Sequence, residues 1–115
     1  MVLSGCNITD ASVSLLGNCH TVYLSGCHNI TDLSIKMLVK CRVLSLGRCK
    51  KITDASVALL DSCDKLYLND NIQLSNECIR KLHKCREVQL WRCPQLTRET
   101  INYLREKGCL VSPYN

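Results

Sequence analysis

The sequence repeats itself with a period of 22 residues, and two sets of marker residues define the period. The first set is Cys19, Cys41, Cys63 and Cys85, and the second, eight positions later in each copy, is Cys27, Cys49, Asn71 and Cys93. A unit of this length is too small to bury its own apolar side, so copies have to stack on one another. The sequence therefore predicts a single domain of about five stacked units, residues 1–18, 19–40, 41–62, 63–84 and 85–108, followed by a truncated strand over 109–115.

Each unit has the pattern of a strand, a turn and a helix. Apolar residues alternate between the two markers, as at Val22 and Leu24, which is typical of a strand with one buried face. An Ile-Thr-Asp motif or a looser version follows the second marker, and its Thr or Ser is expected to cap a helix with apolar residues at helical spacing. These patterns predict an α/β fold with a parallel sheet on the concave face and helices on the convex face.

The pattern is clearest in residues 41–54, where Leu44, Leu46 and Cys49 precede Ile52-Thr53-Asp54. This pattern resembles that of cysteine-containing leucine-rich repeats, and the in-register copies cover nearly the full chain. The resemblance implies a leucine-rich-repeat solenoid. It also implies a role similar to that of the substrate-recognition part of F-box proteins in ubiquitin ligases.

The ten cysteines contain no C-x-x-C pair, so a structural zinc site is not expected. Cysteines of the first marker column are expected to face inward at the start of each strand. Those of the second column, which begins with Cys6, are expected to bond exposed backbone groups of the next unit, a role that Asn71 can also fill. Free thiols at this density indicate a reducing compartment, the cytoplasm or alternatively the nucleus. A thiol-based redox or metal-responsive protein is the alternative reading.

The net charge of +5 is modest, and all fifteen lysines and arginines lie after Ile35. A net positive charge of this size is typical of solvated helix faces, so nucleic-acid binding is not expected. No apolar stretch approaches the roughly 18 residues of a membrane span, and no membrane partner is expected. The predicted helix side carries a basic group, which is either a solvated face or a site for an acidic partner. Its members are Arg80, Lys81, His83, Lys84 and Arg86, with Lys36, Lys40 and Arg42 two units earlier.

Function is expected on the concave face, where the repeat does not dictate residue identity. The outward strand positions and the strand ends combine aromatic with charged side chains, a composition enriched at protein interfaces. Sheet propensity is the competing explanation for the aromatic residues. The candidate protein-binding residues are Tyr23, Arg48, Lys65, Tyr67, Asn69, Asp70, Glu87, Gln89, Trp91 and Arg92.

No catalytic, metal-binding or cofactor-binding residues are predicted, because the sequence has no Gly-rich phosphate loop and its recurring serines occupy one structural column. The prediction is therefore a non-enzymatic module that binds another protein through its concave face. Met1-Val2-Leu3 starts inside the first predicted strand without a cap. This open end predicts either end-to-end self-association or a longer array.

Overall fold

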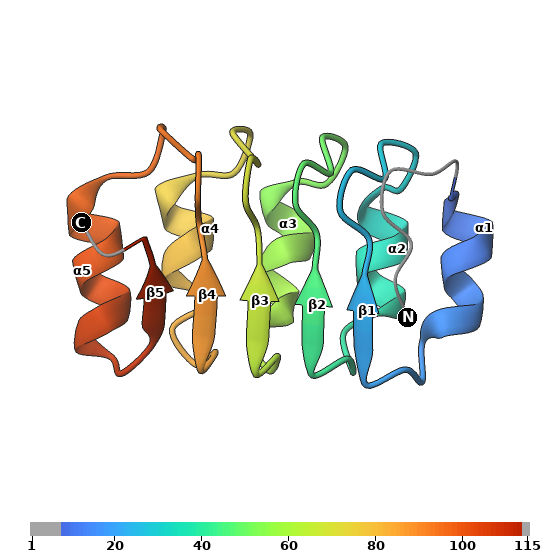
Figure 1. Cartoon of the computed structure of the whole chain (residues 1–115), viewed down its shortest axis with the longest axis horizontal. Helices are drawn as coiled ribbons and strands as arrows, with labels where there is room; N and C mark the ends of the chain where they lie inside the picture. The colour runs from blue at the N-terminus through green and yellow to red at the C-terminus, as the bar shows by residue number, and fades with distance from the viewer. Residues whose placement is uncertain (1–7, 114–115) are drawn as a thin grey trace.

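The computed structural model describes residues 8–113, which form a five-stranded parallel sheet with helices, an α/β fold. The strands lie in chain order, with each strand paired to the next in parallel (Figure 1). They are β1 (Thr21–Tyr23), β2 (Val43–Ser45), β3 (Lys65–Tyr67), β4 (Glu87–Gln89) and β5 (Leu110–Ser112).

The helices lie together on one face of the sheet, behind the strands in Figure 1, and leave the other face uncovered by helices. Two of the short helices continue as a 3₁₀ turn. The helical elements are α1 (Asp10–Val13) with η1 (Ser14–Leu16), α2 (Asp32–Met37), α3 (Asp54–Val57) with η2 (Ala58–Leu60), α4 (Asn76–Arg80) and α5 (Arg98–Glu106). None of the helices in residues 8–113 is long and apolar enough to cross a membrane.

Strand register places residues that are 22 positions apart side by side. Thr21 pairs with Val43, Val43 with Lys65, and Lys65 with Glu87. The last pair is offset by 23, from Glu87 to Leu110, because α5 is longer. The chain turns after this helix at Gly108, whose φ of +95° suits a residue without a side chain. Equivalent residues of successive units therefore form rows across the sheet.

The core lies between the sheet and the helices and consists of the alternating strand residues and the apolar helix residues. The strand residues predicted to face inward are all buried: Val22, Leu24, Leu44, Leu46, Leu66, Leu68, Val88 and Leu90. The predicted helix positions are buried as well, except that Ile101 is only partly buried. Removal of this aliphatic surface from water is the main stabilising term, at about 25 cal/mol per Å².

The turn cysteines bond to the preceding unit, so the prediction that they bond to the next unit is wrong. Cys49 Sγ donates to the carbonyl oxygen of Leu24 (3.3 Å). In the same row, Asn71 Nδ2 donates to the Leu46 carbonyl oxygen (2.9 Å), which confirms that an amide can replace the thiol. The acceptors lie just beyond the strand ends of the preceding units, Leu24 after β1 and Leu46 after β2, so each turn side chain satisfies a carbonyl group that follows the neighbouring strand. Cys6 lies outside the described residues.

The helix caps follow the predicted pattern only in part. The side chains of Thr31, Ser75 and Thr97 accept a hydrogen bond from a first-turn N–H, whereas those of Thr9 and Thr53 do not. The Thr53 hydroxyl instead donates to the carboxylate of Asp32 in the preceding unit (2.5 Å). Capping residues therefore connect units as well as starting helices.

Candidate functional site

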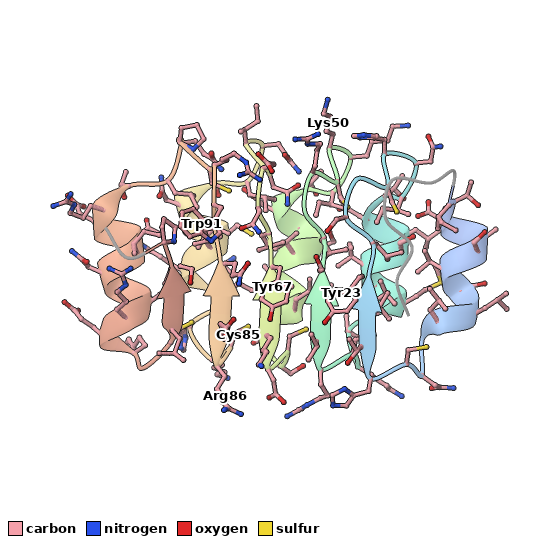
Figure 2. The ribbon with its side chains drawn as sticks, viewed as in Figure 1. Tyr23, Lys50, Tyr67, Cys85, Arg86 and Trp91 are labelled. Carbon is pink, nitrogen blue, oxygen red and sulfur yellow. The ribbon has the colours of Figure 1, made fainter. Side chains whose placement is uncertain are left out.

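The uncovered face of the sheet presents the three aromatic residues that the sequence placed there, Tyr23, Tyr67 and Trp91 (Figure 2). Tyr23 and Tyr67 lie in one row, separated by Ser45. Ser45 is buried, and its hydroxyl is 2.8 Å from that of Ser25. Trp91 follows β4 and leaves 46% of its surface exposed. The aromatic residues therefore line the face from β1 to β4.

Tyr67 lies among polar neighbours on this face. Partial burial raises the pKa of Tyr67, and the nearby Glu87 carboxylate and Tyr23 raise it further. Lys65 and Glu87 are register partners on adjacent strands, although no ion pair joins them in the described part of the chain. The Tyr67 hydroxyl therefore remains protonated near physiological pH, with the Glu87 carboxylate as a neighbouring hydrogen-bond acceptor.

Asn69 joins the ends of β3 and β4 through its side-chain amide. Its Nδ2 donates to Gln89 Oε1 (3.3 Å), and its Oδ1 accepts from the backbone N–H of Trp91 (2.8 Å). These contacts hold the backbone at Trp91 in place. Asn69 and Gln89 were predicted as binding residues, and in the structure they also support the indole-bearing segment.

One row of residues at the strand ends has left-handed backbone conformation. Its members are Gly26, Arg48, Asp70 and Arg92, with φ values of 76°, 52°, 64° and 55°. Glycine adopts such angles at no steric cost, whereas Arg and Asp are strained there. Three predicted binding residues therefore occupy positions that the backbone itself would favour for glycine.

Asp70 and Arg92 form a bidentate ion pair across two units. Arg92 Nε donates to one carboxylate oxygen (2.8 Å) and Nη2 to the other (2.9 Å). The hydrogen bond from Arg92 lowers the pKa of the Asp70 carboxyl, outweighing the opposing effect of desolvation. Arg92 is thereby held in one orientation beside Trp91.

A pocket of about 420 Å³ opens at the strand ends and brings several candidate residues together. We call it the strand-end pocket. It is lined by Ser25, Gly26, Gly47, Arg48, Asn69, Asp70 and Arg92. Four of these were predicted binding residues, and Ser25, Gly26 and Gly47 were not. The signal that could have found them is the column of small residues in the outward row, where Gly47 stands between Ser25 and Asn69.

The other predicted residues lie outside this pocket. They lie within the strands, except for Trp91, which follows β4; the strand residues are Tyr23, Lys65, Tyr67, Glu87 and Gln89. A second, apolar pocket of about 520 Å³ lies beyond Arg92 and is lined by Ile72, Leu90, Arg92, Cys93, Pro94 and Pro113. The strand ends therefore carry a polar pocket and an apolar one on either side of Arg92.

The basic group on the helix side is partly engaged within the chain. The Arg80 guanidinium lies 5.9 Å from the ring centroid of Tyr103, and the His83 ring meets that ring edge-on at 6.2 Å. Cation–π contacts of this kind stabilise a solvated helix face. Lys81 lines a shallow groove between α3 and α4.

The cysteines carry no sign of an activated thiol in the described residues. All nine that the structure describes are free, and eight of them are buried, with Cys19 partly exposed. Burial raises the pKa of Cys49, Cys63 and Cys85 to about 12. Within residues 8–113, no group of three or more His, Cys, Asp or Glu side chains is placed to hold a metal ion.

Comparison with known proteins finds a structural match only. No family model matches the chain, and no curated protein matches it. The structure is similar to a chain in the crystal structure of the Rad7 and Elc1 complex in yeast, with a TM-score of 0.66 and 23% sequence identity. The match covers 84% of this chain and 30% of that chain, so this chain spans about a third of its neighbour's length. At this identity the likeness shows that the two share a fold.

Proposed function

We propose that the chain is a leucine-rich-repeat solenoid of the cysteine-containing type that binds another protein through the uncovered face of its sheet and has no catalytic activity of its own. The observation that carries the proposal is that three aromatic residues, Tyr23, Tyr67 and Trp91, lie on a face that no helix covers (Figure 2). Rigid aromatic side chains flanked by charged groups are typical anchors of protein interfaces.

The setting of the proposed function is that of a substrate receptor in a ubiquitin ligase, as the sequence resemblance implies. The structural neighbour belongs to a complex of two proteins, which supports a partner-binding role for this fold. The cytoplasm, or alternatively the nucleus, is the proposed location, supported by nine free thiols among the described residues.

The thiol-based redox or metal-responsive alternative has less support. A reactive cysteine needs a lowered thiol pKa and solvent access. The pKa of Cys49 and Cys63 is shifted in the opposite direction, up to about 12. The free thiols are better explained as packing residues and weak donors to backbone carbonyls.

The test is affinity purification from cell extract followed by calorimetry with the captured partner. Trp91→Ala and Tyr67→Ala should each weaken binding by about 2 kcal/mol or more, because interface anchors of this type have such effects. Both side chains lie outside the core, so the melting temperature should change little.

The matched controls are Lys81→Glu and Lys84→Glu on the helix side, which should change the binding free energy by less than about 0.5 kcal/mol. If the helix-side reversals abolish binding while Trp91→Ala leaves it intact, the proposal is wrong and the basic helix face becomes the site.

A further inference from the structure

We propose that the strand-end pocket binds the side-chain carboxylate of an Asp or Glu in the protein segment that the sheet face recognises. The inference rests on the proposed function, because it names the chemistry of the partner at the same surface. The pocket lies where the segments that follow β1, β2, β3 and β4 meet.

Arg48 is the main donor of the pocket. Its side chain is exposed, and among the described residues it makes no ion pair, in contrast to Arg42 and Arg92, which pair with Asp64 and Asp70. A guanidinium carries five N–H donors in a planar fork that matches a carboxylate. Arg48 therefore makes no direct ion pair in the described chain. The acidic group whose pKa its charge lowers, Asp70 in the same pocket, is already bound through both oxygens by Arg92.

Arg92 supplies further donors from the opposite side of the pocket. Its Nε and Nη2 are used by Asp70, which leaves Nη1 and the second Nη2 hydrogen available. The bidentate pair also neutralises Asp70, which would otherwise repel an anion. Two arginines and one aspartate line the pocket, so its net charge is positive.

The floor of the pocket is open because Gly47 has no side chain. A Cβ at this position would lie 3.4 Å from both Ser25 Oγ and the carbonyl oxygen of Asn69, which is ordinary contact distance. An alanine can therefore be accommodated without a collision, and its methyl group would occupy part of the pocket. Gly47→Ala is for this reason a probe of the pocket that should leave the fold intact.

The backbone conformation of the pocket supports a binding role. Arg48, Asp70 and Arg92 are held at positive φ, where the first unit has Gly26. Strained conformations of this kind persist where the surrounding structure enforces them, and they cluster at ligand-binding sites. In this chain the strained row coincides with the arginines that line the pocket.

The test uses the intact protein and a phage-displayed random 12-residue peptide library fused to the coat protein, so that the peptides have no free carboxyl terminus. Binding peptides are then synthesised with blocked termini and measured by fluorescence polarisation. We expect the selected peptides to share an Asp or Glu, and its replacement by Asn or Gln should weaken binding at least tenfold.

Arg48→Asn is the decisive variant, because Asn tolerates positive φ and removes the charge while preserving the backbone. It should weaken binding of the acidic peptide at least tenfold and have no more than a twofold effect on the amide-containing peptide. Gly47→Ala should also weaken binding of the acidic peptide. Lys50→Gln is the matched control, since it removes an exposed positive charge from the same loop, two residues beyond Arg48 and outside the pocket lining (Figure 2), and should change binding less than twofold.

Failure of this inference can be told apart from failure of the proposed function. The carboxylate pocket alone is overturned if peptide binding is weakened by Trp91→Ala or Tyr67→Ala but is unchanged by Arg48→Asn and by removal of the peptide carboxylate. If binding of every selected peptide is unchanged by Trp91→Ala, Tyr67→Ala and Arg48→Asn, both the carboxylate pocket and the proposed function are contradicted. Equal losses from Lys50→Gln and Arg48→Asn also overturn the inference, because they indicate a diffuse charge effect.

Discussion

Asp32 holds Thr53 of the following unit through two hydrogen bonds, from the Thr53 backbone N–H (2.7 Å) and from its hydroxyl (2.5 Å). The same carboxylate accepts a bond from the buried hydroxyl of Ser56 (2.5 Å). Asp10 is bonded in the same way by Thr31 and Ser34. Asp54 accepts in the same way from Ser75, and Asn76 takes this place toward Thr97 and Thr100. A column of three aspartates and one asparagine therefore connects the starts of α2, α3, α4 and α5 to the helix before each.

Removal of this link should destabilise the protein measurably. Asp32→Ala removes three charge-assisted bonds and leaves the buried Ser56 hydroxyl with only the Thr53 carbonyl oxygen as acceptor (3.3 Å), so it should lower the free energy of unfolding by about 1–3 kcal/mol. Urea denaturation followed by circular dichroism measures the change.

The matched control is Asp64→Ala, which removes an aspartate from the exposed ion pair with Arg42. Exposed pairs contribute about 0–1 kcal/mol, so this variant should remain close to wild type. An equal loss for both variants would show that the carboxylate column is not a special link between units.

Stability should decline in acid because of the same carboxylates. Burial raises the pKa of Asp32, but the bonds from Ser56 and Thr53 outweigh it, so the folded-state pKa lies below the ordinary value of 3.8. The pKa of Asp10 is lowered in the same way, by Ser34 and Thr31 against the effect of burial. Their stabilisation is therefore present above about pH 4 and is lost as the pH falls below that value.

Urea denaturation at pH 6 and pH 3 measures this decline. Wild type should lose more stability between these pH values than Asp32→Asn, whose amide does not titrate. If the variant and wild type show the same pH dependence, Asp32 is not one of the groups responsible.

The period and the alternation were enough to predict the sheet and its core, because apolar patterning is a property of each segment by itself. Alternation alone predicts that Val22, Leu44 and Leu66 lie on the buried face, and the structure confirms it. Hydrogen bonds between units depend on side-chain torsions and on register, which no single segment encodes. For this reason the role of Asp32 toward Thr53 was missed, although the two recur 21 positions apart in successive units.

The candidate site was predictable to a similar degree. Alternation places Tyr67 outward, and the structure confirms that it lies on the uncovered face. The positive φ of Arg48 was not predictable, because its residue type argues against that conformation. The strand-end pocket depends on that backbone and on the missing side chain of Gly47, and so it could be recognised only in three dimensions.

The two cysteine columns should respond differently to serine. Cys41 is buried, and no hydrogen bond is found for its thiol within the described residues, unlike the thiols of Cys63 and Cys85, which donate to carbonyl oxygens. Cys41→Ser therefore places an unpaired hydroxyl in the core at a cost of about 1–3 kcal/mol. A serine at Cys49 can donate to the Leu24 carbonyl oxygen, which the thiol now bonds, and should cost less. Thermal denaturation measures both, and equal losses in melting temperature would contradict the assignment of the columns.

Most thiols should be unreactive until the protein unfolds. A thiol with a pKa of about 12, as at Cys63 and Cys85, has roughly one thiolate in ten thousand at pH 8. In a Cys6→Ser background, Ellman's reagent should label Cys19 first, because Cys19 is partly exposed, and the buried cysteines only after addition of urea. Rapid labelling of several buried thiols in the native protein would favour the redox alternative.

Arg48 should be a position where glycine stabilises the chain. Left-handed conformation costs a non-glycine residue about 1–2 kcal/mol, and the extra flexibility of glycine in the unfolded state costs about 0.5–1 kcal/mol. With φ at 52°, Arg48→Gly should therefore raise the free energy of unfolding by about 0.5–1 kcal/mol. Arg48→Ala removes the same side chain but keeps the strain, so it should be close to wild type. Urea denaturation of both variants measures the contribution of the backbone conformation to the free energy of unfolding. A glycine variant no more stable than the alanine variant would show that the left-handed conformation costs no free energy at this position.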